Sequence, residues 1–302
     1  MDFRAILMGV AFVLMWSSAF TSARIIVEHA PPMMSLAARF LISGLIAMGI
    51  AAAMGQKLRL TRGQWRATVI FGVCQNALYL GLFFVAMQWI EAGLASIIAS
   101  TMPLMVGLFG WLVLGERLRP MAVAGLVLGV IGAALIMGTR ISGGADLGGV
   151  ALCILGTAAL SVATLSARGA SSGGNVMMVV GLQMLVGSAC LGVVSPFLED
   201  WRITWDLSLV LAFSYTVLVP GIAATFLWFV LVARIGAVKA ATFHFLNPFF
   251  GVLVAAVVLG ERIGPLDMLG VAIVAAGILA VQLSKQAPAP ASVPVADAPD
   301  KS

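Results

Sequence analysis

The chain has 302 residues, of which 62% are hydrophobic and 10% are charged, and its formal net charge is +5. Soluble domains carry about 25% charged residues, so this composition excludes an ordinary soluble domain. Ten runs of 17 or more residues contain no Asp, Glu, Lys or Arg. Because a helix needs about 20 mostly apolar residues to cross a bilayer, the sequence predicts an all-α integral membrane protein with ten transmembrane helices.

The ten runs leave little sequence for a soluble catalytic domain. In chain order they cover residues 5–23, 40–56, 67–90, 92–115, 120–139, 147–167, 169–198, 207–233, 240–260 and 268–284, and the second extends backward across Arg39 to Pro31. Residues 286–302 carry four prolines and few large apolar side chains, so we expect a disordered cytoplasmic tail. The three cysteines lie inside runs without metal-ligand spacing, so no metal and no cofactor is expected.

The basic residues predict the orientation. Twelve Lys and Arg residues fall in the loops and ends on the side of the termini, and four fall in the loops on the other side. Short basic loops resist translocation, so both termini are predicted in the cytoplasm, with the protein in a bacterial inner membrane. This topology accounts for the net positive charge, and no nucleic-acid partner is expected.

The chain contains an internal repeat. When the sequence is aligned with itself without a gap so that Ala92 pairs with Ala237, 12 of the 46 positions from Ala92 to Met137 are identical to those from Ala237 to Gln282. Ten helices in two copies leave five in each, and an odd number turns the second copy upside down in the membrane. We therefore predict two inverted five-helix repeats, residues 1–140 and 141–285, an arrangement found in transporters with the site between the copies.

The best-matched segment is the corner Leu-Gly-Glu-Arg, at residues 114–117 and 259–262. It has a structural explanation: Gly115 or Gly260 ends a helix, and the following glutamate lies near the start of the next helix, where negative charge is favourable. Glu116 and Glu261 are therefore predicted to stabilise helix ends.

In several motifs the sequence resembles the drug/metabolite transporter superfamily, specifically its EamA-type ten-helix exporters of amino acids and other metabolites. The motifs that carry the resemblance are Trp16-Ser17-Ser18-Ala19-Phe20, Arg39, Ala95 through Pro103, and the two Leu-Gly-Glu-Arg corners. Their order and their duplication extend the resemblance from the first run to Ser284. The resemblance implies a ten-helix carrier of small metabolites.

Polar side chains inside the runs are candidates for a binding site, because a polar group in hydrocarbon is costly unless it faces a cavity or a partner. In the third run Asn76, Tyr79 and Phe83 recur at helical spacing and should share one face. In the ninth run His244 and Asn247 are three residues apart and should be neighbours. The residues predicted to bind substrate are Trp16, Ser17, Phe20, Asn76, Tyr79, Phe83, Ser100, His244 and Asn247.

Four further residues are predicted to act in gating or as hinges. Pro103, Pro220 and Pro248 fall near the centres of their runs, where each removes a backbone hydrogen bond and permits a bend or a free carbonyl. Arg39 lies inside the second run, and gating, carboxylate binding and snorkelling to the headgroups are all open for it.

These features, together with the resemblance, lead us to expect an inner-membrane transporter that exports small metabolites, foremost amino acids including aromatic or hydrophobic ones, by alternating access and facilitated diffusion. No Asp or Glu lies in the middle of a run, and no phosphate-binding glycine loop for ATP is present. The alternatives are a proton-coupled exporter of drugs or lipophilic cations, an intramembrane enzyme and a structural or receptor protein. The expected partners are a small-molecule substrate and the lipid bilayer; the oligomeric state stays open, and a monomer is compatible with the sequence.

Overall fold

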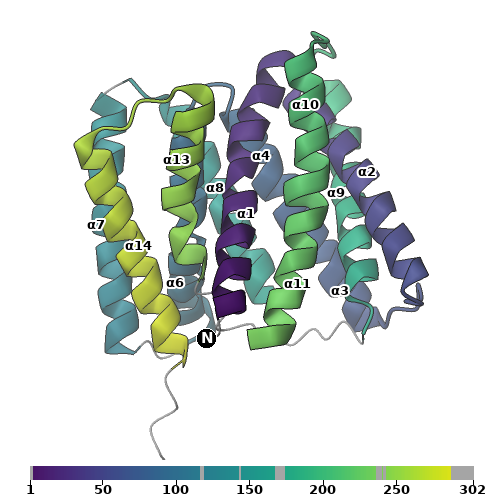
Figure 1. Cartoon of the computed structure of the whole chain (residues 1–302), viewed down its shortest axis with the longest axis horizontal. Helices are drawn as coiled ribbons and strands as arrows, with labels where there is room; N and C mark the ends of the chain where they lie inside the picture. The colour runs from purple at the N-terminus through teal and green to yellow at the C-terminus, as the bar shows by residue number, and fades with distance from the viewer. Residues whose placement is uncertain are drawn as a thin grey trace, which may run out of the picture.

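The computed structural model describes residues 3–115, 119–142, 144–166, 174–235, 240 and 243–286. In that part of the chain every regular element is a helix, and Figure 1 shows the helices packed lengthwise in one bundle. The α-helices are α1 (Phe3–His29), α2 (Pro32–Ala53), α3 (Arg62–Phe71), α4 (Leu80–Ala86), α5 (Ala92–Ser100), α6 (Met102–Leu114), α7 (Pro120–Ser142), α8 (Leu147–Ser166), α9 (Val176–Leu198), α10 (Leu207–Thr216), α11 (Ala224–Ile235), α13 (Asn247–Leu259) and α14 (Pro265–Gln286). Two π-helical segments, η1 (Gly72–Tyr79) and η2 (Val217–Ala223), and the 3₁₀ segment η3 (Phe243–Leu246) join some of them.

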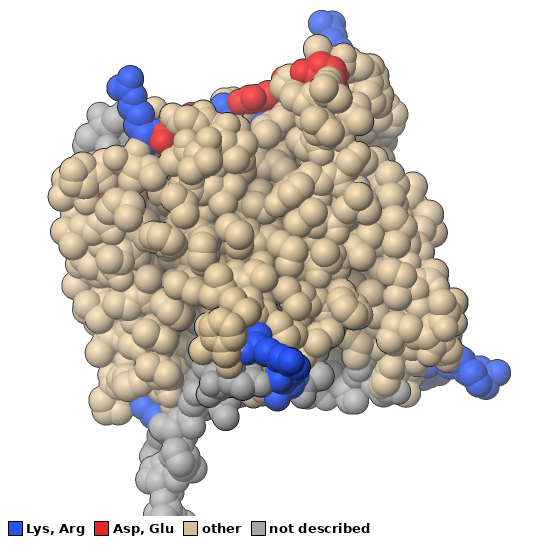
Figure 2. All heavy atoms as spheres, in the orientation of Figure 1, with Lys and Arg blue, Asp and Glu red and all other residues tan. Residues whose placement is uncertain are grey.

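The helices have the length and the surface of a multi-pass membrane protein. Eight helical stretches of 19 to 27 residues are apolar enough to cross a membrane, and two shorter apolar helices cover Pro120–Ile136 and Phe243–Leu259. In Figure 2 the coloured charged side chains gather toward the two ends of the bundle, and an uncharged band lies between them. The start of α1 and the end of α14 lie at the same end of the bundle, the lower one in Figure 1, which we call the terminal side. The opposite end is the far side.

Several helix ends follow from local sequence. Thr61 and Gln64 form a capping box at the start of α3, in which each side chain accepts a hydrogen bond from the backbone N–H of the other residue. Asp206 accepts a hydrogen bond from the N–H of Leu209 at the start of α10 (2.8 Å). That bond and the hydroxyl of Ser208 hold the pKa of the Asp206 carboxyl below its usual range.

The backbone repeats some features at the same offset as the internal sequence repeat. Helices α6 and α13 begin at positions paired by that offset and also end at paired positions, and the segments η1 and η2 begin at paired positions as well. Gly115 and Gly260 end α6 and α13 with φ values of 65° and 70°, in the left-handed region that favours glycine. The helix-ending role predicted for the two corner glycines is therefore confirmed.

Two expected boundaries fall within helices. The division expected between residues 140 and 141 lies inside α7, which continues to Ser142. The tail expected from residue 286 starts at Gln286, the last residue of α14, and residues 287–302 lie outside the described part. Loss of hydrophobicity does not by itself end a helix.

The corner glutamate Glu261 contacts a helix from the other half of the sequence. Its two carboxylate oxygens accept hydrogen bonds from the backbone N–H groups of Ala92 (2.7 Å) and Gly93 (2.9 Å). It therefore caps α5, a contact that its place in the corner motif did not indicate. Gly93 leaves room for this contact, because a Cβ there would lie 2.8 Å from the Glu261 Oε2 atom. Glu116 lies outside the described residues.

We expect Glu261→Ala to lower the stability of the protein by about 1–3 kcal/mol, because two N–H groups at the start of α5 lose their acceptor. The melting temperature of the purified protein in detergent measures the loss. Glu28→Ala is the matched control, since Glu28 is half exposed and pairs with Arg24 on the helix surface, a contact worth less than about 0.5 kcal/mol. Equal melting temperatures for the two variants would contradict the capping role.

The apolar core consists of one large cluster and two smaller ones. The large cluster fills the far-side halves of α1, α2, α4, α5, α8 and α10, includes residues of α6, α7, α9 and α13, and continues along α14 to Ile278 and Val281, toward the terminal side. Toward the terminal side, one smaller cluster joins α1, α11 and η3, and another joins α2 and α9. The far side is thus packed by one cluster, and the terminal side is shared among three.

Candidate functional site

A cavity of about 410 Å³ lies among the helices, with wall residues from α1, α2, α3, η1, α4, α5, α6, α8, α9, η2, α11, η3 and α13. Its size is that of a small-molecule site. Its wall is mostly apolar and aromatic, with a few amide and hydroxyl groups, and no Asp or Glu is among the described residues that line it. Several wall residues lie near the terminal-side ends of their helices, such as Thr164 near the end of α8 and Val180 near the start of α9.

Ten of the thirteen predicted site residues lie in the wall of this cavity. They are Trp16, Phe20, Asn76, Tyr79, Ser100, His244 and Asn247 from the substrate-binding set, and Arg39, Pro103 and Pro220 from the gating set. Ser17, Phe83 and Pro248 are not in the wall. The structure thus gathers most of the set around one space, and the binding role of each residue stays a prediction.

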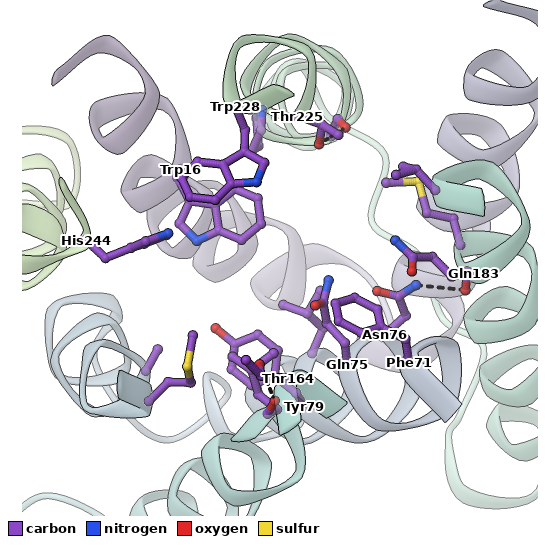
Figure 3. Close-up of a pocket in the computed structure, with 18 of the residues that line it drawn as sticks. Trp16, Phe71, Gln75, Asn76, Tyr79, Thr164, Gln183, Thr225, Trp228 and His244 are labelled. Atoms are coloured by element: carbon purple, nitrogen blue, oxygen red, sulfur yellow. Dashed lines mark hydrogen bonds between the residues drawn. The ribbon is translucent and has the colours of Figure 1, made fainter. Parts of the chain in front are cut away.

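One side of the cavity carries amides, and Figure 3 shows them close together. The Asn76 side-chain Nδ2 atom donates a hydrogen bond to the backbone carbonyl of Gln183 (2.8 Å). Two glycines let η1 and α9 approach this closely: a Cβ on Gly72 would lie 2.7 Å from the Gln183 carbonyl oxygen, and one on Gly187 would lie 2.3 Å from Asn76 Cβ. The remaining polar atoms of Gln75, Asn76 and Gln183 can therefore serve a ligand.

The other side of the cavity carries aromatic rings around His244. The His244 ring lies 5.5 Å from the Phe12 ring and 5.3 Å from the Trp228 ring, and Phe12 also packs on Trp16 at 5.7 Å, all measured between centroids. Figure 3 shows Trp16, Trp228 and His244 grouped across from the amides. This wall offers flat apolar surface for an aromatic or apolar group.

Hydrogen bonds orient His244. The Ser17 hydroxyl donates to Oδ1 of Asn247 (3.4 Å) and to the Asn247 backbone carbonyl (3.3 Å). The Asn247 Nδ2 atom in turn donates to Nδ1 of His244 (2.9 Å), as the three-residue spacing predicted. A neutral imidazole that accepts at Nδ1 carries its proton on Nε2, so His244 keeps one donor free for a ligand. Ser17 is not part of the cavity wall, and it is linked to His244 through Asn247.

Phe83 lies behind the cavity wall and not in it. Phe83 is fully buried, with its ring 4.8 Å from the Tyr79 ring and 5.9 Å from the Phe20 ring. It therefore packs against two residues of the wall, and its part in substrate binding stays a prediction.

Two of the three central prolines lie at helix breaks, and the third lies in a π-helical segment. The break between α5 and α6 falls at Thr101, so Pro103 lies in the first turn of α6, and Pro248 lies in the first turn of α13 after η3. Pro220 lies inside the π-helical segment η2. A proline in a first helical turn loses no hydrogen bond, which explains why a helix restarts at Pro103 and at Pro248. Pro248 is buried and is not among the residues of the cavity wall.

The prediction omitted several wall residues. The polar ones are Gln75, Thr164, Gln183 and Thr225, and the aromatic ones are Phe12, Phe40, Phe71 and Trp228. Gln183 could have been found by the rule that selected Asn76, since it is an amide within a long apolar run. The aromatic residues carry no such signal, because aromatic side chains are common on every face of membrane helices.

The sequence pattern of the EamA-like transporter family matches residues 3–138 and again residues 147–283. The chain belongs to the EamA-like transporter family. This EamA-like protein is 25% identical over 291 residues to the uncharacterized transporter YvbV of Bacillus subtilis, which covers 96% of this chain and 95% of YvbV. It is 26% identical over 283 residues to the uncharacterized inner membrane transporter YedA of Escherichia coli, which covers 91% of this chain and 89% of YedA. With its apolar helices it is a multi-pass inner-membrane protein.

A shorter match and a solved structure complete the comparison. The EamA-like protein is 31% identical over 139 residues to the aromatic amino acid exporter YddG of Ancylobacter novellus, covering 46% of this chain and 48% of that exporter. A solved crystal structure aligns over 95% of this chain and 99% of its own length, with a TM-score of 0.66 and 23% identity. The two proteins share a fold.

Proposed function

We propose that this EamA-like protein exports amino acids, including aromatic and hydrophobic ones, by facilitated diffusion. The observation that carries the proposal is the composition of the cavity wall, with aromatic rings on one side and amides on the other and no carboxylate among its described residues. Such a wall suits a zwitterion with an apolar side chain. The partial match to an aromatic amino acid exporter supports the same substrate class.

Alternating access between two inverted five-helix repeats is the proposed mechanism. The proposed topology has ten transmembrane helices, cytoplasmic termini, and two repeats that cover residues 1–140 and 141–285. The helix boundaries that recur in both halves and the two family matches support it. The cavity lies toward the terminal side, and the far side is filled by one apolar cluster. With cytoplasmic termini, this arrangement corresponds to an inward-facing state of the carrier.

Counterflow in proteoliposomes tests the function. Vesicles that contain the purified protein are loaded with unlabelled tryptophan and diluted into a trace of labelled tryptophan, without any ion gradient. We expect transient accumulation of the label, because exchange through a carrier needs no external energy, and none in protein-free vesicles. Exchange that appears only under a pH gradient would contradict facilitated diffusion. The same experiment is run with a labelled lipophilic cation and with other labelled amino acids. Exchange of the cation and of no amino acid would favour a drug exporter. Failure of every amino acid to exchange would contradict the proposal.

A further inference from the structure

Arg39 presents a buried charge at the cavity without an acidic partner. Its side chain lines the cavity, and the residue is only 7% exposed. Its Nε atom has no hydrogen-bond partner, and Arg39 takes part in none of the ion pairs found within the described residues. A buried charge is costly unless it is paired and hydrogen-bonded, so this guanidinium has donors available for an anion.

Among the described residues, the surroundings of Arg39 supply no compensating negative charge. The guanidinium carbon lies 5.4 Å from the centre of the Phe40 ring, and Tyr79, whose phenol is uncharged, is the titratable group nearby. Ser43, one turn further along α2, is also buried, and its hydroxyl has no hydrogen-bond partner. A cation–π contact with Phe40 does not replace a carboxylate.

We propose that Arg39 binds the carboxylate of the ligand, so that the cavity selects small molecules that join a carboxylate to an apolar or aromatic body. The planar guanidinium fork can donate two parallel hydrogen bonds to one carboxylate. The amides of the cavity can hold polar groups, and the rings around His244 can receive the apolar body. This inference rests on the proposed function and assigns to Arg39 a binding role in place of the gating role predicted from the sequence.

Paired ligands in which a neutral amide replaces the carboxylate test this assignment. Indole-3-acetate and tryptophan are compared with indole-3-acetamide and tryptophan amide by the ligand-induced rise in melting temperature of the purified protein in detergent. We expect the wild-type protein to bind each acid about tenfold or more tightly than its amide, which is the usual contribution of a charge-assisted hydrogen bond. In Arg39→Gln the ratio of the affinity for the acid to the affinity for its amide should fall close to one, and the amides should still bind.

Two further variants keep the test decisive. Arg24→Gln removes a partly exposed arginine that pairs with Glu28 outside the cavity, and it should retain the acid preference. If Arg39→Gln does not yield folded protein, Arg39→Lys replaces it, since a point charge on a flexible stem cannot form the two parallel bonds and should lower the ratio. An acid-to-amide ratio that is unchanged in the Arg39 variant overturns the assignment, and so does a wild-type protein that binds acids and amides alike or binds neither.

The outcomes separate this inference from the proposed function. Acid preference that depends on Arg39, together with no counterflow of any amino acid, would support the carboxylate site and contradict amino acid export. Counterflow of tryptophan and tryptophan amide at equal rates in both the wild type and Arg39→Gln would support a carrier and contradict the carboxylate site.

Discussion

Gly277→Ala is expected to destabilise the protein by about 3 kcal/mol and to lower its melting temperature by roughly 10 °C. Helices α7 and α14 touch through their backbones, and a Cβ on Gly277 would lie 2.6 Å from the Gly125 carbonyl oxygen and 2.7 Å from the Gly129 nitrogen. Backbone atoms cannot move aside as a flexible side chain can. The two helices would have to separate and lose packing along their length, the main source of attraction between helices in a membrane.

Gly138→Ala on α7 is the matched control, because nothing lies within 4 Å of a Cβ placed there. It should leave the melting temperature unchanged or raise it slightly, since alanine favours a helix more than glycine does. Both variants are measured by thermal unfolding and size-exclusion chromatography in the same detergent. If Gly277→Ala were as stable as Gly138→Ala, the close backbone packing of α7 on α14 would be wrong.

Trp228→Ala is expected to reduce tryptophan counterflow by about tenfold or more. The Trp228 ring lies 4.9 Å from the Phe12 ring and 5.3 Å from the His244 ring, and it forms part of the cavity wall. Its removal takes away a stacking surface for the substrate and also loosens its two neighbours. The loss should be greater for tryptophan than for a non-aromatic substrate such as threonine. Trp228→Phe should restore part of the rate.

Trp111→Ala on α6 is the control for this variant. Trp111 is 51% exposed and is not part of the cavity wall, so its removal should leave counterflow within about twofold of the wild type. The rates are compared at equal amounts of reconstituted protein, with melting temperatures measured alongside. A Trp228→Ala protein that exchanges tryptophan as fast as Trp111→Ala would exclude the aromatic wall from substrate binding.

The sequence by itself determined the class of this protein and the ends of several helices. Long runs without charge can be stable only in a bilayer, so their presence is sufficient to indicate membrane helices. Gly115 and Gly260 end helices because the left-handed backbone conformation at these positions strains any residue with a side chain, and glycine has none. The polarity rule selected Asn76, His244 and Asn247 because amide and imidazole groups need partners wherever the helix places them.

Only the tertiary structure decided which partners those groups meet. Phe83 packs in the core behind Tyr79 and Phe20, and the Glu261 carboxylate reaches α5, which belongs to the other half of the sequence. Trp228 reaches the cavity wall because η2 and α11 pack beside α1. Hydrophobicity and helical period are properties of neighbouring residues, and they specify which segments are helical. Which face of a helix packs against another helix depends on contacts between residues that are far apart in the sequence. Neither hydrophobicity nor helical period describes such contacts.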